Sequence, residues 1–242
     1  MKPSNRRMHT ALPILLTVVA SCAHDPAERE YLAALRGEEE GMSRQEQIVR
    51  LDRAIALQPG RVHFWETRSI YRIDLRDFEH ARADLDQAIR LHERPYLHFL
   101  RGLVLCESGH PAEAIPDFDA AISGQPENAQ FYRGLALARV AVGRPQEALE
   151  DAARLIALSS QTAESYYARG IALAKLGRDR EAIDDFTESL RRRPELVYPL
   201  RARADFYQRA NLPERAAVDR AEATKRENQH RSCAPCVDPL RY

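Results

Sequence analysis

The sequence lacks the residue clusters on which most enzyme active sites are built. It contains no glycine-rich loop of the kind that cradles phosphate groups, and no Ser/His/Asp combination in a suitable structural context. Its eight histidines are scattered and do not follow the spacing of metal ligands. We therefore expect no enzyme, no metal site and no bound cofactor.

The chain also lacks net charge, because 36 Lys and Arg residues balance 36 Asp and Glu residues. A balanced charge argues against a general nucleic-acid binder. The charge is nevertheless uneven: acids exceed bases by 8 to 5 over residues 25–60, and bases exceed acids by 12 to 7 over residues 191–242. This asymmetry has two interpretations. It orients a protein partner or a second copy of the chain in a homodimer, or it reflects solvated helix faces.

The N-terminal segment has too few apolar residues for a permanent transmembrane helix. About ten of them occupy positions 11–20, where a bilayer span needs about 20. Lys2, Arg6 and Arg7 precede this run. A basic segment followed by a short apolar run is typical of a secretory signal peptide, which we assign to residues 1–21.

The apolar run ends with Val19, Ala20, Ser21 and Cys22, a series that resembles the bacterial lipobox. The resemblance implies cleavage before Cys22 and lipid attachment to its thiol, which would anchor the chain without a transmembrane helix. Ala23 in place of Asp implies the outer membrane, facing the periplasm, if the host has two membranes. The alternatives are an ordinary signal peptide with a nearby cysteine, or a soluble cytosolic protein whose signal is misread.

Cysteine is scarce, and the tail 231–242 holds the single Cys-x-x-Cys, Cys233 and Cys236. Zinc needs four ligands, and His230 with two cysteines supplies at most three. A local disulfide is the expected state in an oxidising compartment, while an intermolecular bridge or a redox role stays open. Cys106 is expected to be a half-buried helix residue.

The rest of the chain repeats with a period of 34 residues, over 62–94, 95–128, 129–162, 163–196 and 197–230; the first repeat is one residue short. Each repeat has a small residue in its first half (Ser69, Gly102, Ala136, Gly170, Ala204) and an alanine in its second half (Ala81, Ala114, Ala148, Ala182, Ala216). Residues from Ser43 onward resemble the second half of a further repeat, with Glu46 completing a capping box. Residues 22–42 form a linker with a possible degenerate helix.

This pattern resembles the tetratricopeptide repeat (TPR) family, whose 34-residue unit is a helix–turn–helix. The resemblance implies an all-α fold, a right-handed superhelical solenoid of about five TPR units within the array 43–230. Small residues lie where the two helices of a unit cross closely. Arg133 and Gly134 would suggest another register for the third repeat. We reject this register because Gly143 and Ala148 keep the 34-residue spacing.

Turn residues agree with this assignment. Gly109, Gly143, Gly177 and Asn211 stand where the first helix of a unit ends in a left-handed conformation. Arg76 stands there in the first unit, at a cost of about 1–2 kcal/mol if the backbone is the same.

A second series recurs once per repeat, so we interpret it as structural and not catalytic. Arginine precedes the small residue in all units except the third, which has Leu135, and aspartate follows the second-helix alanine by three positions. We predict Arg–Asp pairs that fix geometry more than they add stability. The residues are Arg68, Arg101, Arg169 and Arg203, with Asp84, Asp117, Asp151, Asp185 and Asp219.

The family resemblance also implies a partner-binding concave groove lined by first helices. Its positions carry over to His63, Glu66, Ile70, Tyr96, Phe99, Leu103, Gln130, Arg133, Leu137, Glu164, Tyr167, Ile171, Tyr198, Arg201 and Asp205. Such a surface suits a peptide or protein segment with a few acidic groups, although many of these residues could simply pack the superhelix. The family's two-carboxylate clamp is excluded, because Ile70, Leu103 and Leu137 replace its asparagine.

The resulting hypothesis is a membrane-anchored lipoprotein of the bacterial cell envelope that acts as an adaptor or assembly scaffold. The alternative is an envelope thiol–disulfide or metal-handling protein that uses Cys233 and Cys236, with the repeats as a docking platform.

Overall fold

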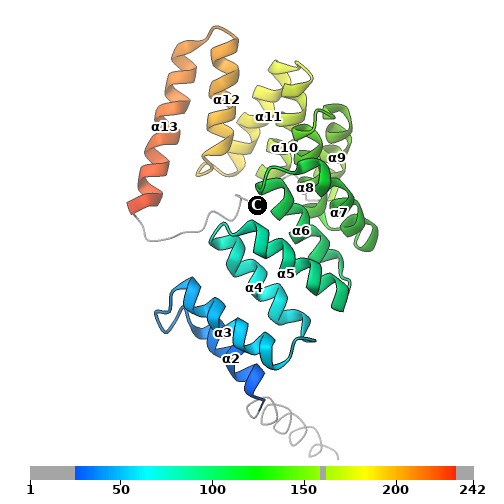
Figure 1. The fold of residues 1–242 in the computed structure, drawn as a ribbon. Coiled ribbons are helices and arrows are strands. Elements are labelled where there is room, and N and C mark those ends of the chain that lie inside the picture. The colour runs from blue at the N-terminus through cyan, green and yellow to red at the C-terminus, as the bar shows by residue number, and fades with distance from the viewer. Residues whose placement is uncertain (1–24, 159–161, 233–242) are drawn as a thin grey trace, which may run out of the picture. The chain divides into compact units, whose positions relative to one another are not determined.

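The computed structural model describes residues 25–158 and 162–232, and these residues form twelve α-helices and no strand (Figure 1). Residues 1–24 and 233–242, which include Cys22, Cys233 and Cys236, lie outside the described part. The chain divides into two compact units, Met1–Glu93 and Arg94–Tyr242. The division falls at the end of the repeat that is one residue short, within the array predicted as one block over 43–230.

The first unit holds two helical hairpins, each helix packed on the next in the chain. The helices are α2 (Pro26–Arg36), α3 (Arg44–Leu57), α4 (Val62–Asp74) and α5 (Phe78–Leu91). Ser43 caps α3 and forms the predicted capping box with Glu46. The expected degenerate helix exists as α2, and its packing on α3 completes a hairpin ahead of the five full repeats.

Gln47 holds α2 against α3 at the position where other second helices carry alanine. Its side chain is 2% exposed, and its Nε2 donates to the carbonyl oxygen of Ala34 at 2.9 Å. The same carbonyl also accepts from the backbone N–H of Gly37 at 3.2 Å, so Gln47 adds a second donor at the end of α2. Gln47 packs closely against this end of the helix, since a Cβ atom on Gly37 would lie 2.8 Å from its Cγ.

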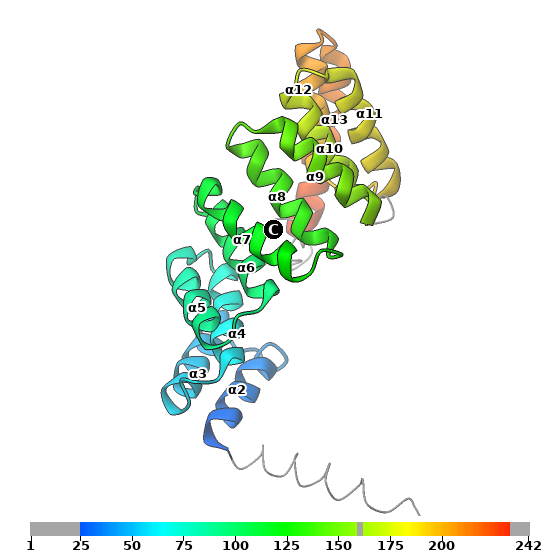
Figure 2. The same cartoon turned by 90° about the vertical axis from the view of Figure 1, so that its right-hand side faces the viewer.

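The second unit continues the alternation of first and second helices (Figure 2). Its helices are α6 (Pro95–Glu107), α7 (Pro111–Gly124), α8 (Ala129–Ala141), α9 (Pro145–Leu158), α10 (Ala163–Lys175), α11 (Asp179–Arg192), α12 (Tyr198–Arg209) and α13 (Pro213–Ser232). Three of the second helices, α7, α9 and α11, pack against both their own first helix and the next one.

Aromatic rings fill the crossings of the second unit, which is why glycine occurs inside its helices. A Cβ atom on Gly102 would lie 2.7 Å from Cε1 of Phe118, and one on Gly170 would lie 2.7 Å from Cε1 of Phe186. Gly134 faces the same Phe118 ring, at 2.6 Å. Gly134 therefore does not mark a shifted register; it makes room for the phenylalanine of the preceding repeat.

The turns keep one backbone geometry throughout. The predicted left-handed positions have φ of +86° at Gly109, +81° at Gly143, +76° at Gly177 and +57° at Asn211. Arg76 adopts the same conformation, with φ of +60°. The first full repeat therefore bears the predicted strain of a non-glycine residue in this region.

Candidate groove and its Arg133 cluster

The Arg–Asp pairs form as predicted and set the spacing of the helices that carry the candidate groove. In four repeats the guanidinium Nε and Nη2 atoms donate to the two carboxylate oxygens over 2.6–2.9 Å, and the aspartates are buried. Such bidentate pairs fix the angle between two helices because both groups are planar. They are structural side chains, one per repeat.

In the third repeat, which has Leu135 in place of the paired arginine, another arginine binds the aspartate. Leu135 is buried in the aromatic core, and Arg139, one helical turn further along α8, binds Asp151 through Nη1 at 2.8 and 2.7 Å. Arg72 already reaches Asp84 from the equivalent position of α4, at 2.7 Å. The identical spacing of 12 residues in both pairs is the sequence signal that could have predicted this contact.

The predicted groove residues of the first unit lie on α4 and are half-buried. The His63 ring meets the Tyr31 and Phe64 rings edge-on, with centroid distances of 4.8 and 4.5 Å, and its Nε2 lies 3.6 Å from Glu28. His63 therefore contributes to the packing of α2 on α4. Glu66 and Ile70 are half-buried on the same helix.

In the second unit, Phe99 is buried and Tyr96 is exposed. Phe99 is 7% exposed and belongs to the core, with its ring 5.0 Å from that of Phe131. Phe99 therefore packs between helices and does not line a groove, because α7 and α8 already cover its ring. Tyr96, with its ring 6.1 Å from Phe99, is the aromatic side chain that α6 presents to solvent. Leu103 is partly buried against the same core, while Gln130 is exposed and Leu137 half-buried on α8.

Polar groove residues of the first helices α8, α10 and α12 interact with one another, since Arg133 interacts electrostatically with Tyr198 and Glu164. The Tyr167 ring of α10 meets the Tyr198 ring of α12 edge-on, with centroids 4.4 Å apart. Glu164 of α10 accepts a hydrogen bond of 2.6 Å from Nη1 of Arg193. We call Arg133, Glu164, Tyr167, Arg193 and Tyr198 the Arg133 cluster.

The electrostatics of the Arg133 cluster favour hydrogen-bond donors. Burial lowers the pKa of Arg133, while nearby Tyr198 and Glu164 oppose this shift; an arginine nevertheless stays charged. Burial raises the pKa of both Tyr167 and Tyr198, so both phenols keep their protons at neutral pH. The cluster therefore contains two guanidinium groups and two phenolic hydroxyl groups, all hydrogen-bond donors, beside the single carboxylate of Glu164.

The remaining predicted groove residues of the second unit have other partners and are not members of the Arg133 cluster. Ile171 packs against the apolar core next to Tyr167. Arg201 is held by Glu227 of α13 at 2.6 Å, and Asp205 lies 3.5 Å from Arg220. Arg193 was not among the groove residues predicted from the sequence. The sequence feature that could have indicated it is an arginine directly after a second helix, at the position where other repeats have Gln58 and Gln125.

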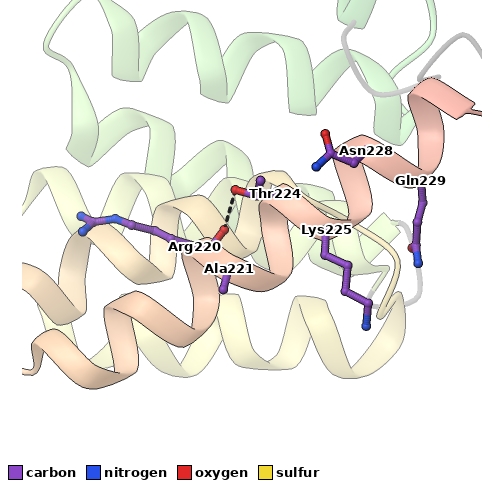
Figure 3. A pocket seen from close by; sticks show the side chains of 6 residues that line it. All are labelled: Arg220, Ala221, Thr224, Lys225, Asn228 and Gln229. Atoms are coloured by element: carbon purple, nitrogen blue, oxygen red, sulfur yellow. Dashed lines mark hydrogen bonds between the residues drawn. The ribbon is translucent and has the colours of Figure 1, made fainter.

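The last described helix, α13, presents a polar face where earlier second helices carry apolar side chains. An open depression on this face is lined by Arg220, Ala221, Thr224, Lys225, Asn228 and Gln229 (Figure 3). Arg220 stands at the repeat position of Phe118 and Phe186.

A family model described as Tetratricopeptide repeat matches residues 67–129, 99–161 and 134–197, which together cover more than half of the chain. The chain belongs to the tetratricopeptide repeat family. A search of the curated proteins found no match.

Solved structures support the TPR fold at low sequence identity. A TPR protein from Parabacteroides merdae is 18% identical, with a TM-score of 0.72, over 89% of this chain and 85% of that one. A chain of the APC/C complex Cut9-Hcn1 is 14% identical, with a TM-score of 0.73, over 90% of this chain and 43% of that one. YrrB, another TPR protein, is 16% identical, with a TM-score of 0.61, over 77% of this chain and 96% of that one.

The described residues also give information on Cys106, on metal-binding clusters and on membrane-spanning helices. Cys106 is half-buried, as predicted, and burial raises the pKa of its thiol to about 12. Within the described ranges no group of His, Cys, Asp or Glu side chains is arranged to hold a metal ion. No helix in the same ranges is both long and apolar enough to cross a bilayer.

Proposed function

We propose that this TPR protein is a membrane-anchored lipoprotein that acts as a non-enzymatic adaptor or assembly scaffold in the bacterial cell envelope. TPR proteins are typically protein-interaction scaffolds, and YrrB is described as having an unusual peptide-binding site. The lipobox-like series that ends at Cys22 supports the anchor. The observation that supports partner binding best is the Arg133 cluster.

The Arg133 cluster suits a partner segment that carries a carboxylate or several exposed carbonyl oxygens. Arg133, Tyr167 and Tyr198 supply donors from three helices, and their protons are retained at neutral pH. Leu137 and Ile171 provide half-buried apolar surface on the same helices. A few polar groups placed within an apolar surface are typical of peptide-binding grooves.

Crosslinking pull-down from intact envelopes tests this proposal. We expect Arg133→Gln to reduce recovery of the specific partner by about tenfold or more, because the substitution leaves a buried acceptor of the partner without its cation. Arg191→Gln is the matched control, since Arg191 is 69% exposed, is paired with Glu188 and lies on α11, a second helix outside the predicted groove. Equal recovery with both variants would contradict a role for the Arg133 cluster.

Two further measurements separate this function from the alternatives. Mass spectrometry of the mature N-terminus should find an acylated Cys22, and an unmodified Met1 would exclude the lipoprotein assignment. Replacing Cys233 and Cys236 with serine should leave activity in the envelope intact. Loss of that activity with partner binding retained would favour a thiol–disulfide function.

A further inference from the structure

Hydrogen bonds hold the start of α2, at one edge of the first unit, to the loop that joins α3 to α4. Asp25 caps α2 by accepting from the backbone N–H of Ala27 at 3.0 Å. Nε2 of Gln58 donates to both carboxylate oxygens of Asp25 at 2.9 Å, and Nη2 of Arg61 lies 3.6 Å away. The first described residue is therefore bonded to the loop that joins α3 to α4.

Only three residue steps separate this edge from Cys22. A fully extended chain covers at most about 11 Å in three steps. The headgroup layer of a bilayer is itself about 5–8 Å thick on each side. If Cys22 carries acyl chains, as proposed above, Asp25 and the α3–α4 loop have to lie at or close to the lipid surface.

The side chains at this edge suit that position. Leu57 ends α3 and is 55% exposed, and Leu91 ends α5 and is 37% exposed. Both occupy the same repeat position, 34 residues apart. Because successive helices of a hairpin run in opposite directions, the ends of α3 and α5 lie on the same edge as the starts of α2 and α4.

The later repeats do not share this feature. Among the described residues of the second unit, α7, α9 and α11 end at Gly124, half-buried Leu158 and half-buried Arg192. Exposed leucines at the last position of a second helix therefore occur, within the described part of the chain, in the two repeats nearest to Cys22.

Trp65 fixes the loop that follows Leu57. Its Nε1 donates to the carbonyl oxygen of Pro59 at 2.8 Å, while its ring packs on the core that includes Ala27 and Phe64. Arg61, with a side chain that is 51% exposed, lies on the same loop. Tryptophan and arginine are common at membrane interfaces, where an apolar body meets polar headgroups.

We propose that the edge formed by Leu57, Pro59, Arg61, Trp65 and Leu91 rests on the interfacial region of the phospholipid bilayer that holds the lipidated N-terminus. This inference depends on the proposed lipid anchor and adds to it an orientation for the first unit. The anchor keeps the edge at high effective concentration near the lipid, so two leucines and one arginine suffice for contact. The first unit is then held at a set angle to the membrane and does not swing on a flexible tether.

Trp65 is the single tryptophan of the chain and reports this contact directly. The lipidated full-length protein is reconstituted in phosphatidylcholine vesicles with or without lipids brominated near the headgroup. We expect the brominated lipids to reduce Trp65 fluorescence at least twofold. The double variant Leu57→Glu, Leu91→Glu should lose most of this quenching, because buried carboxylates are unfavourable in the interface.

Leu75→Glu is the matched control, since Leu75 is a 45% exposed leucine at the opposite end of α4. It should leave the quenching unchanged. Circular dichroism of each variant verifies that the helices are intact.

The outcomes separate this inference from the proposed function. An acylated Cys22 with unquenched Trp65 would overturn the edge contact and leave the lipoprotein assignment standing. An unmodified N-terminus would overturn both. A dimer of the non-lipidated protein that disappears with Leu57→Glu, Leu91→Glu would assign the edge to a second copy of the chain and overturn the contact with lipid.

Discussion

Arg139 binds Asp151 through one terminal nitrogen, Nη1, which contacts both carboxylate oxygens at 2.8 and 2.7 Å. Its Nε atom is buried and has no hydrogen-bond partner. In the other four repeats, Nε and Nη2 each bind one oxygen of the aspartate. The substitute pair therefore stabilises its carboxylate less well, and burial raises the pKa of Asp151 from 3.8 to about 6.

The raised pKa of Asp151 makes the stability of the third repeat depend on pH. The folded chain binds more protons than the unfolded chain between about pH 4 and 6, so the free energy of unfolding falls as the pH rises through this window. The expected loss is on the order of 2 kcal/mol. Urea unfolding at pH 4 and pH 7.5 should show this loss as the difference between the wild type and Asp151→Asn, because the other carboxylates contribute equally to both proteins.

Asp185→Asn is the control for this experiment. It removes one side of the bidentate pair with Arg169 and should destabilise the protein by about 1–3 kcal/mol at both pH values. The same change of stability between pH 4 and 7.5 in the wild type and in Asp151→Asn would contradict the role of Asp151.

Arg76 strains the turn between α4 and α5. Its φ of +60° is unfavourable for a residue with a Cβ atom. A cation–π contact, with the guanidinium 5.0 Å from the Phe78 ring centroid, offsets part of this cost. Arg76→Gly should therefore stabilise the protein by about 1 kcal/mol. Gly177→Ala tests the converse, because a Cβ atom there meets no neighbour within 4 Å and only the backbone conformation is penalised. Thermal unfolding should move in opposite directions for the two variants.

Gly134 and Phe118 should be energetically coupled across adjacent repeats. Gly134→Ala places a methyl group 2.6 Å from Cε1 of Phe118, so we expect a destabilisation of about 1–3 kcal/mol. Phe118→Leu removes the ring and should relieve most of the additional cost of the alanine. A double-mutant cycle by urea unfolding measures this coupling, and strictly additive effects would show that the two residues do not constrain each other.

Cys106 should be nearly inert in the folded protein. With a pKa of about 12 its thiol is almost entirely protonated at pH 8, whereas an ordinary cysteine is partly ionised. We expect alkylation of Cys106 to be at least about a hundredfold slower in buffer than in denaturing urea. Mass spectrometry of the peptide that contains Cys106 follows both rates, and similar rates would argue against its burial.

Local sequence patterns were sufficient for the architecture of this TPR protein. The 34-residue period, the turn residues at Gly109, Gly143 and Gly177, and the capping box at Ser43 act over a few residues along one helix or turn, so they can be recognised without the fold. The Arg–Asp pairs were predictable for a similar reason: their constant separation of 16 residues in each repeat follows from one repeated hairpin.

Only the tertiary structure decided which side chains remain available to a partner. Phe99 and Tyr96 look equally suited to a groove in the sequence, but neighbouring helices cover the first and leave the second exposed. The replacement of the missing arginine by Arg139, and the approach of Arg193 to Glu164, depend on distances between helices. The attachment of the start of α2 to the loop after Leu57 follows from bonds between Asp25 and Gln58, 33 residues apart. The local patterns that identify a repeat do not contain such contacts between repeats, because each depends on how neighbouring helices pack in space.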